Sequence, residues 1–121
     1  MARERFITVL VCGGRDYSDR DRVYATLDHL HETRAVSEII YGCAPGADTL
    51  ARDWARRTGR ESTGFPADWK RLGKAAGPIR NTRMIEEGKP DLVIAFPGGK
   101  GTANMVAQAR AAGIEVIEIT K

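Results

Sequence analysis

The stretch FITVLVCGG, residues 6–14, decides the fold. Residues 6–12 form an almost unbroken run of β-branched and apolar side chains, which the pair Gly13-Gly14 ends. Such a run is typical of a strand that is buried on both faces, as in the centre of a parallel sheet. We therefore predict a central parallel strand at 6–12, followed by a loop at 13–17.

Helices and strands alternate along the rest of the chain. A cap at Ser18 or Asp19 begins a helix that runs to about residue 33. Its buried side carries Val23, Leu27 and Leu30, which recur at i, i+4 and i+7. Further strands are predicted at 37–41, 60–64, 91–96 and 114–119, and further helices at 47–57 and 101–112.

Residues 66–77 have no regular pattern, and we predict a loop there with one helical turn. Pro78 then opens a helix in its preferred first-turn position, and this helix runs to Gly88. Within the helix at 47–57, Trp54 is predicted to be a core residue. The two histidines, His29 and His31, are predicted to be surface residues of the first helix.

Strands that alternate with helices at this spacing indicate a parallel sheet with helices on both faces, because right-handed crossovers return each strand beside its neighbour. We predict a single α/β domain over residues 1–121. It is a three-layer, Rossmann-like domain with a mainly parallel five-stranded sheet in the order 3-2-1-4-5. The one-sided alternation of residues 114–119 predicts an edge strand.

Composition favours a small anionic ligand. The 121 residues include 19 basic and 16 acidic side chains, for a net charge of +3, and no run of five or more Lys or Arg. This mild excess favours a phosphate-bearing small molecule over a nucleic-acid partner.

No apolar segment suits a signal peptide or a membrane span, so we expect a cytoplasmic protein with no membrane partner. Cys12 and Cys43 form no C-x-x-C pair or Cys/His cluster, so no metal or other cofactor is expected.

Three glycine-containing loops follow directly on predicted strands, at 13–16, 42–48 and 97–102. The carboxyl ends of parallel strands meet at one edge of the sheet, where ligands bind at the point at which the strand order reverses. Helix N-termini present free N–H groups at the same edge. We therefore expect the three loops to converge on one pocket.

The loop at 97–102 has the sharpest signal. Three glycines within four residues allow the backbone to approach an anion closely, while Lys100 and Thr102 add donors. The loop is neither a Walker A motif nor a G-x-G-x-x-G fingerprint, because Asn104 occupies the place of the third glycine. The alternative is a tight strand-to-helix turn that binds no ligand.

Basic residues stand near the start of the helix at 78–88. Arg80, Asn81 and Arg83 lie where acidic residues are favoured, which indicates an external anion; a solvated basic face is the alternative. Arg80 is predicted to pair with a phosphate bidentately, and Trp69 and Tyr17 to stack on a base.

Taken together, the motifs VCGGRDY at 11–17, GADTLA at 46–51, the segment 68–84 and FPGGKGT at 96–102 resemble the YspA-like branch of the SLOG superfamily. That superfamily also contains the LOG phosphoribohydrolases and the DprA/Smf DNA-processing proteins. The resemblance implies a Rossmannoid domain that binds nucleotides or nucleotide derivatives for sensing or processing. It also implies a homodimer or a higher homo-oligomer.

The resemblance to LOG enzymes is incomplete at one position. Their loop reads P-G-G-x-G-T-x-x-E, and Met105 stands in this chain where the glutamate is expected. Cleavage of an N-glycosidic bond needs a carboxylate that stabilises charge or activates water. Asp48 is the candidate replacement, followed by Asp16 and Asp68. The alternative roles are a cap or loop hydrogen bond for Asp48, a cap for Asp68, and an ion pair with Arg15 for Asp16.

The leading hypothesis is thus a protein that binds a nucleotide-derived small molecule. The alternatives are a phosphoribohydrolase-type enzyme with Asp48 as the catalytic residue, and a protein that binds single-stranded DNA as DprA does. The predicted ligand-binding set comprises Gly13, Gly14, Arg15, Gly42, Gly46, Asp48, Trp69, Arg80, Asn81, Pro97, Gly98, Gly99, Lys100, Gly101 and Thr102.

Overall fold

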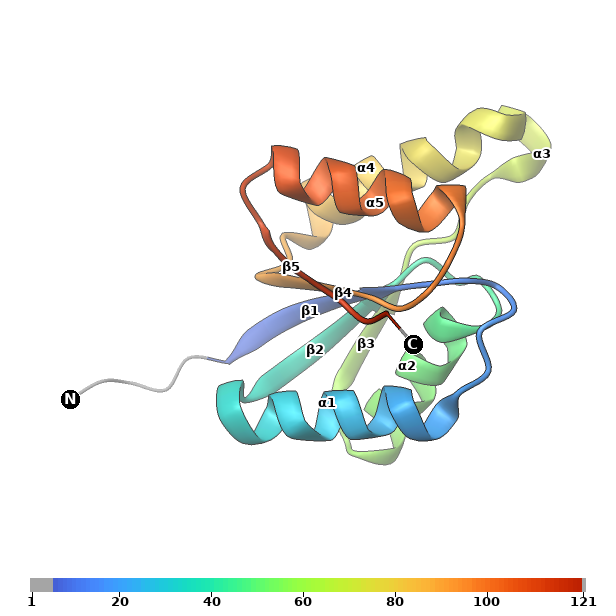
Figure 1. The fold of residues 1–121 in the computed structure, drawn as a ribbon. Coiled ribbons are helices and arrows are strands. Elements are labelled where there is room, and N and C mark those ends of the chain that lie inside the picture. The colour runs from blue at the N-terminus through green and yellow to red at the C-terminus, as the bar shows by residue number, and fades with distance from the viewer. Residues whose placement is uncertain (1–5, 121) are drawn as a thin grey trace.

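A twisted parallel sheet lies between two pairs of helices in the computed structural model, which describes residues 6–120 (Figure 1). The strands are β1 (Ile7–Cys12), β2 (Val36–Tyr41), β3 (Glu61–Gly64), β4 (Leu92–Ala95) and β5 (Glu115–Glu118). The helices are α1 (Arg20–Arg34), α2 (Ala47–Arg57), α3 (Trp69–Leu72), α4 (Ala76–Gly88) and α5 (Lys100–Ala111), with a 3₁₀ turn η1 (Gly73–Ala75).

The strand order is β3-β2-β1-β4-β5, and every neighbouring pair is parallel. This confirms the predicted fold class, the strand order and the edge position of the last strand. From β1 the chain continues to β2 and β3 on one side of the sheet, and from β4 it continues to β5 on the other side. The strand order therefore reverses between the neighbouring strands β1 and β4. A crevice is expected outside the carboxyl ends of these two strands.

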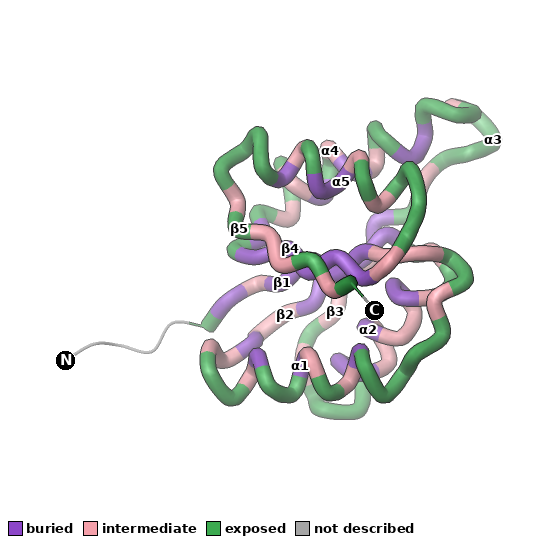
Figure 2. The backbone as a smooth tube through the Cα atoms, viewed as in Figure 1, coloured by how far each residue is buried: buried purple, intermediate pink, exposed green. Residues whose placement is uncertain are grey.

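The central position of β1 explains its unbroken apolar sequence. Val9 and Val11 pack against α1 and α2 on one face, whereas Leu10 and Cys12 pack on the face covered by α4 and α5. All four side chains are buried, and Figure 2 shows the buried residues concentrated in the central strands and on the inner sides of the helices, whereas the edge strands β3 and β5 are exposed or intermediate. Trp54 belongs to the α1 and α2 face, as predicted.

Asp19 caps α1, since its Oδ1 accepts a hydrogen bond from the Arg22 N–H at 3.0 Å. At the other end of the helix, the prediction that His31 is a surface residue was wrong. His31 is half-buried, and its Nδ1 accepts the Val36 N–H at 2.9 Å while its Nε2 contacts Arg60. The imidazole therefore joins the end of α1 to the start of β2.

The segment between β3 and α4 is more regular than the sequence pattern predicted. Residues 69–75 form α3 and η1, and α4 begins at Ala76, so Pro78 is the third helical residue rather than the opening one. The N–H groups of a first helical turn lack intrahelical acceptors, and proline is therefore tolerated there. Asp68 caps α3 by accepting the Arg71 N–H at 3.2 Å.

Within residues 6–120, no helix is both long enough and apolar enough to cross a bilayer.

Candidate ligand-binding site

Gly14 joins the loops that follow β1, β2 and β4. Its N–H donates to the Pro97 carbonyl at 2.8 Å, and its carbonyl accepts from the N–H groups of Tyr17 at 3.2 Å and Ala47 at 3.3 Å. Three turns that are far apart in the sequence are thus held side by side at the carboxyl edge of the sheet. This convergence of the three loops was predicted from the sequence.

Close packing explains two of the glycines in these loops. Gly46 has a φ of +82°, and a Cβ there would collide with the Gly14 carbonyl oxygen. A Cβ on Gly98 would collide with Thr102 Oγ1 and would lie 2.7 Å from the Gly14 nitrogen. Both positions therefore need glycine to let the loops touch, whether or not a ligand is bound.

A pocket of about 870 Å³ opens between these loops and the start of α4. This volume lies within the range of small-molecule sites. All the predicted binding residues line it except Gly42 and Gly46, which belong to the loop between β2 and α2. The lining residues are Cys12, Gly13, Gly14, Arg15, Asp16, Tyr17, Ala44, Asp48, Trp69, Lys74, Gly77, Pro78, Arg80, Asn81, Met84, Pro97, Gly98, Gly99, Lys100, Gly101, Thr102 and Asn104.

Several of these lining residues were not predicted from the sequence. Gly77 and Met84 bracket Asn81 at i−4 and i+3, so a single face of α4 forms one wall of the pocket. Lys74 from η1 and Asn104 from α5 also contribute. The helical spacing of 77, 81 and 84 was the available signal, because Asn81 was already a candidate.

The N-terminus of α5 faces the pocket without a side-chain cap. Gly99 is its N-cap residue, and no side chain of the described chain caps it. A Cβ built on Gly99 or Gly101 would meet none of the described atoms within 4 Å, so the backbone here is open to the pocket. The first N–H groups of a helix lack intrahelical acceptors and carry the positive end of the helix dipole. This turn can therefore receive an anion.

Asp48 both holds a loop and lines the pocket. The side chain is only 5% exposed, and its Oδ2 accepts the N–H groups of Gly42 at 3.0 Å and Ala44 at 3.3 Å. Burial raises the pKa of Asp48 to about 6, although these two hydrogen bonds and Arg80 act in the lowering direction. Its Oδ1 accepts no hydrogen bond from residues 6–120, and that oxygen is not sealed away from the pocket.

Arg80 is already engaged by the protein. Its Nη1 donates to the carbonyls of Gly42 and Phe65, the latter at 3.4 Å, and its Nε donates to Asn81 Oδ1 at 2.9 Å. Only Nη2 has no acceptor within the described chain. The bidentate pairing with a phosphate that the sequence predicted is therefore not available in this arrangement, and Arg80 chiefly ties the loops after β2 and β3 to α4.

Asn81 has a structural role beside its place in the pocket wall. It is 3% exposed, and its Nδ2 donates to the Gly101 carbonyl at 3.3 Å and to Asn104 Oδ1 at 3.1 Å. These bonds join α4 to the first turn of α5. Arg83, by contrast, lies outside the pocket lining and pairs with Glu87 at 3.3 Å, so its charge has a partner within the helix.

Of the other positions considered for a catalytic carboxylate, only Asp16 lines the pocket with a carboxylate. Met105 is fully buried on the inner side of α5, so the position that carries glutamate in LOG enzymes faces the core here. Asp68 caps α3 and is not among the lining residues, whereas Asp16 is one of them.

Cys12 lines the pocket, but burial raises the pKa of its thiol to about 12 and disfavours the thiolate. The described residues contain no cluster of His, Cys, Asp or Glu that is able to hold a metal ion.

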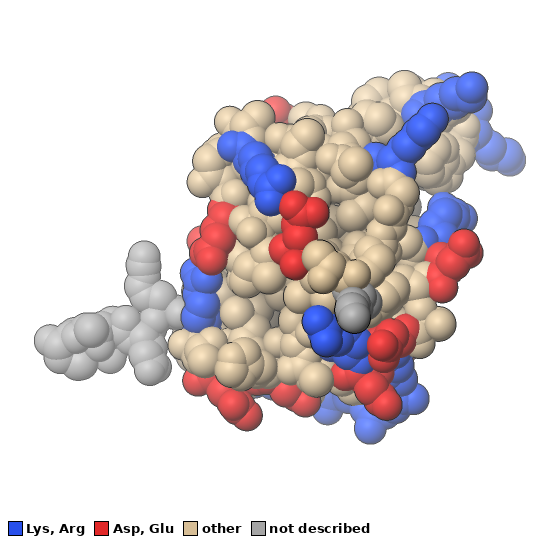
Figure 3. All heavy atoms as spheres, viewed as in Figure 1, with Lys and Arg blue, Asp and Glu red and all other residues tan. Residues whose placement is uncertain are grey.

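Positive charge surrounds the mouth of the pocket. Arg15, Lys74 and Lys100 are exposed there, and Figure 3 shows Lys and Arg side chains gathered over the α3 corner of the molecule. Asp16 and Asp48 are the acidic residues of the lining. The opening therefore favours an anionic ligand.

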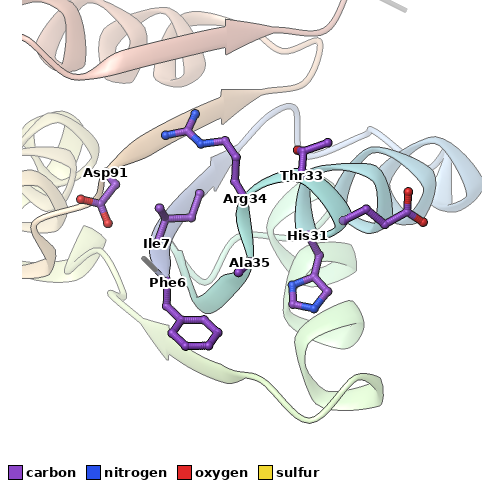
Figure 4. A pocket seen from close by; sticks show the side chains of 8 residues that line it. Phe6, Ile7, His31, Thr33, Arg34, Ala35 and Asp91 are labelled. Carbon is purple, nitrogen blue, oxygen red and sulfur yellow. The ribbon is translucent and has the colours of Figure 1, made fainter. Parts of the chain in front are cut away.

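A second hollow lies at the opposite, amino edge of the sheet (Figure 4). It surrounds the end of α1, where the ring of Phe6 and the imidazole of His31 lie on one side and Arg34 on the other. It contains none of the predicted site residues. The candidate site is thus the pocket at the carboxyl edge.

The first half of the chain is similar to a known protein family. Residues 7–72, which run from β1 to α3 and form more than half of the chain, match the model of the YspA, cpYpsA-related SLOG family. The chain belongs to that family. The match includes the loops after β1 and β2, and it ends before the loop at 97–102.

This SLOG chain has a relative in a bacteriophage. It is 39% identical over 119 residues to the Gene 61 protein of Mycobacterium phage D29, across 90% of this chain and 93% of the relative. Among solved structures it is similar to DNA processing protein A (DprA) from Streptococcus pneumoniae, with a TM-score of 0.76 and 23% identity. The similarity covers 96% of this chain and 51% of DprA, so the SLOG chain spans about half the length of that protein. At this identity the likeness to DprA establishes the shared fold.

Proposed function

We propose that the protein binds a nucleotide or a nucleotide-derived, phosphate-bearing small molecule, as a sensor or a processing protein. One observation carries the proposal: the uncapped first turn of α5, with open backbone at Gly99 and Gly101, faces a pocket of about 870 Å³. Membership of the SLOG family supports a nucleotide-related ligand. The basic rim formed by Arg15, Lys74 and Lys100 supports an anionic one.

Native mass spectrometry tests this proposal. The purified protein is measured alone and with AMP, ADP-ribose, NAD, ribose 5-phosphate or inorganic phosphate. We expect a stoichiometric adduct with at least one organic phosphate, and its loss in Gly99→Val. Lys70→Ala serves as the control, because Lys70 is exposed on α3 outside the pocket lining.

Two outcomes would overturn the proposal. One is that no phosphate compound forms an adduct at concentrations at which the protein remains folded. The other is tight, strongly salt-dependent binding of a single-stranded oligonucleotide in preference to every small molecule, which would favour DNA binding instead.

A second candidate function is hydrolysis of the N-glycosidic bond of a nucleoside monophosphate. The observation that favours it is the Asp48 carboxylate, whose Oδ1 is unpaired within the described chain at the pocket wall. In this reaction water adds to C1′ of the ribose, the C1′–N bond breaks, and the base leaves with a proton. Asp48 would accept the proton of the attacking water or stabilise the developing positive charge.

Incubation with nucleoside monophosphates, followed by chromatography of the released base, tests this second candidate. Turnover that is lost in Asp48→Asn but kept in Asp21→Asn, an exposed residue of α1, would establish it. Absence of released base from a protein that binds the same nucleotide would leave a binding function alone.

A further inference from the structure

The two tryptophans of the chain lie in opposite environments. Trp54 is 2% exposed, and its Nε1 donates to Asp28 Oδ1 at 2.8 Å. Trp69 lines the pocket and is 51% exposed, and its Nε1 donates no hydrogen bond within residues 6–120. Core packing therefore fixes Trp54, whereas half of Trp69 is left accessible to whatever occupies the pocket.

The indole ring of Trp69 is held in place. Asp68 caps the short helix that carries it, and the Leu72 N–H donates to the Asp68 carbonyl at 2.9 Å. The six-membered part of the indole lies against Gly77 of α4, where an added Cβ would be 3.2 Å from Trp69 Cη2. Because Gly77 has no side chain, the six-membered ring of Trp69 can pack beside α4, while the remainder of the indole is exposed.

The position of Trp69 relative to α5 restricts the shape of the ligand. Gly77 and Asn81 are one helical turn apart on α4, which is roughly 6 Å along the helix axis. Asn81 in turn donates to the Gly101 carbonyl at 3.3 Å, within the first turn of α5. Trp69 and the first turn of α5 thus contact neighbouring turns of the same pocket-lining face of α4, so one ligand that carries a flat group and an anion can reach both.

We propose that Trp69 is a stacking platform for the heteroaromatic base of a nucleotide whose phosphate lies at the first turn of α5. The proposal rests on the proposed function of this pocket and adds its selectivity: the site prefers nucleotides to sugar phosphates that lack a base. An indole ring offers a large flat face to a base, and its free N–H adds a donor at the edge. Stacking of a base on an aromatic side chain changes affinity by about 5- to 150-fold.

Isothermal titration calorimetry with AMP and ribose 5-phosphate tests this inference. AMP is expected to bind about 5- to 150-fold more tightly than ribose 5-phosphate to the wild-type protein. Trp69→Ala should remove this preference and leave the affinity for ribose 5-phosphate unchanged, whereas Trp69→Phe should restore most of it. Ile79→Ala is the matched control, since Ile79 is an exposed hydrophobic residue of α4 outside the pocket lining.

Fluorescence supplies an independent measurement. In Trp54→Phe, Trp69 is the sole tryptophan of the chain, and AMP is expected to quench its emission while ribose 5-phosphate leaves it unchanged. Equal affinities for the two ligands, unaltered in Trp69→Ala, would overturn the stacking proposal and leave the proposed function standing. Failure of both ligands and of inorganic phosphate to bind would overturn the proposed function itself.

Discussion

The Gly14 N–H donates to the Pro97 carbonyl at 2.8 Å, and this bond joins the loops after β1 and β4. The two strands are neighbours at the centre of the sheet, where the strand order reverses. The glycines that follow Pro97 are thereby held beside Gly14, so the geometry of the pocket is set by backbone contacts. Substitutions that disturb the backbone should therefore act differently from those that only fill the pocket.

Gly98 and Gly99 are adjacent but should lose different amounts of stability on substitution by alanine. In Gly98→Ala the new Cβ collides with Thr102 and approaches the Gly14 nitrogen, so we expect a loss of about 2 kcal/mol or more in the free energy of unfolding. In Gly99→Ala the new methyl group meets no described atom, and the change at this N-cap position should cost less than about 1 kcal/mol. Urea denaturation of both variants measures the difference, and equal losses would contradict it.

Lys100→Ala should weaken ligand binding modestly. Lys100 is exposed beside the first turn of α5, and an exposed charge contributes about 0.2 to 1 kcal/mol, or up to about fivefold in affinity. The effect should fade as salt is raised from about 0.05 M to 0.5 M, because exposed charges are screened. Calorimetry at two salt concentrations is the measurement. Lys70→Ala should show no effect, and an equal loss in both variants would indicate a non-specific contribution of charge.

The sheet was predictable because a strand that is buried on both faces consists almost entirely of apolar residues. The sequence of β1 has few polar positions, and 3-2-1-4-5 is a usual order for a five-stranded doubly wound sheet with right-handed crossovers. The segment from α3 to η1 was not predictable, since its four- and three-residue elements are too short for a hydrophobic period. Local hydrogen bonds such as the Asp68 cap stabilise it instead.

The loops that form the site were predictable from the sequence, but the roles of individual residues within them were not. Gly98 and Gly99 are identical in sequence, yet one packs against Thr102 and the other faces open space. Arg80 was expected to be available to a ligand, but its acceptors include Gly42 and Phe65, which are 38 and 15 positions away. Such contacts depend on how β2, β3 and α4 come together, and a motif read along the chain does not contain that information.

Gly46→Ala should destabilise the protein strongly. The position has a φ of +82°, and the added Cβ collides with the Gly14 carbonyl, so strain and a steric clash act together. Gly59→Ala is the matched control, because Gly59 has a similar φ of +76° but no described atom within 4 Å of its Cβ. The control should lose about 1 to 2 kcal/mol from backbone strain alone, and Gly46→Ala measurably more. Thermal and chemical denaturation compare them, and equal losses would mean that the loop contact at Gly14 is unimportant.

Asp48 should make the stability of the protein depend on pH between about 4 and 6. Burial raises the pKa of its carboxyl from 3.8 to about 6, so within this range the folded protein holds a proton that the unfolded chain releases. The stabilisation from this proton is fully present below pH 4 and is lost as the pH rises through 6. The difference between the two pKa values corresponds to about 3 kcal/mol.

Asp48→Asn isolates this contribution, because the amide oxygen can accept the same N–H groups and does not titrate. Relative to the wild type, the free energy of unfolding of this variant should rise by up to about 3 kcal/mol between pH 4 and pH 7. Asp21→Asn, at an exposed position of α1, should follow the wild-type curve. Urea denaturation across this range is the measurement. Parallel curves for the wild type and Asp48→Asn would mean that the carboxylate is better solvated through the pocket than its burial implies, so that it ionises near its ordinary pKa.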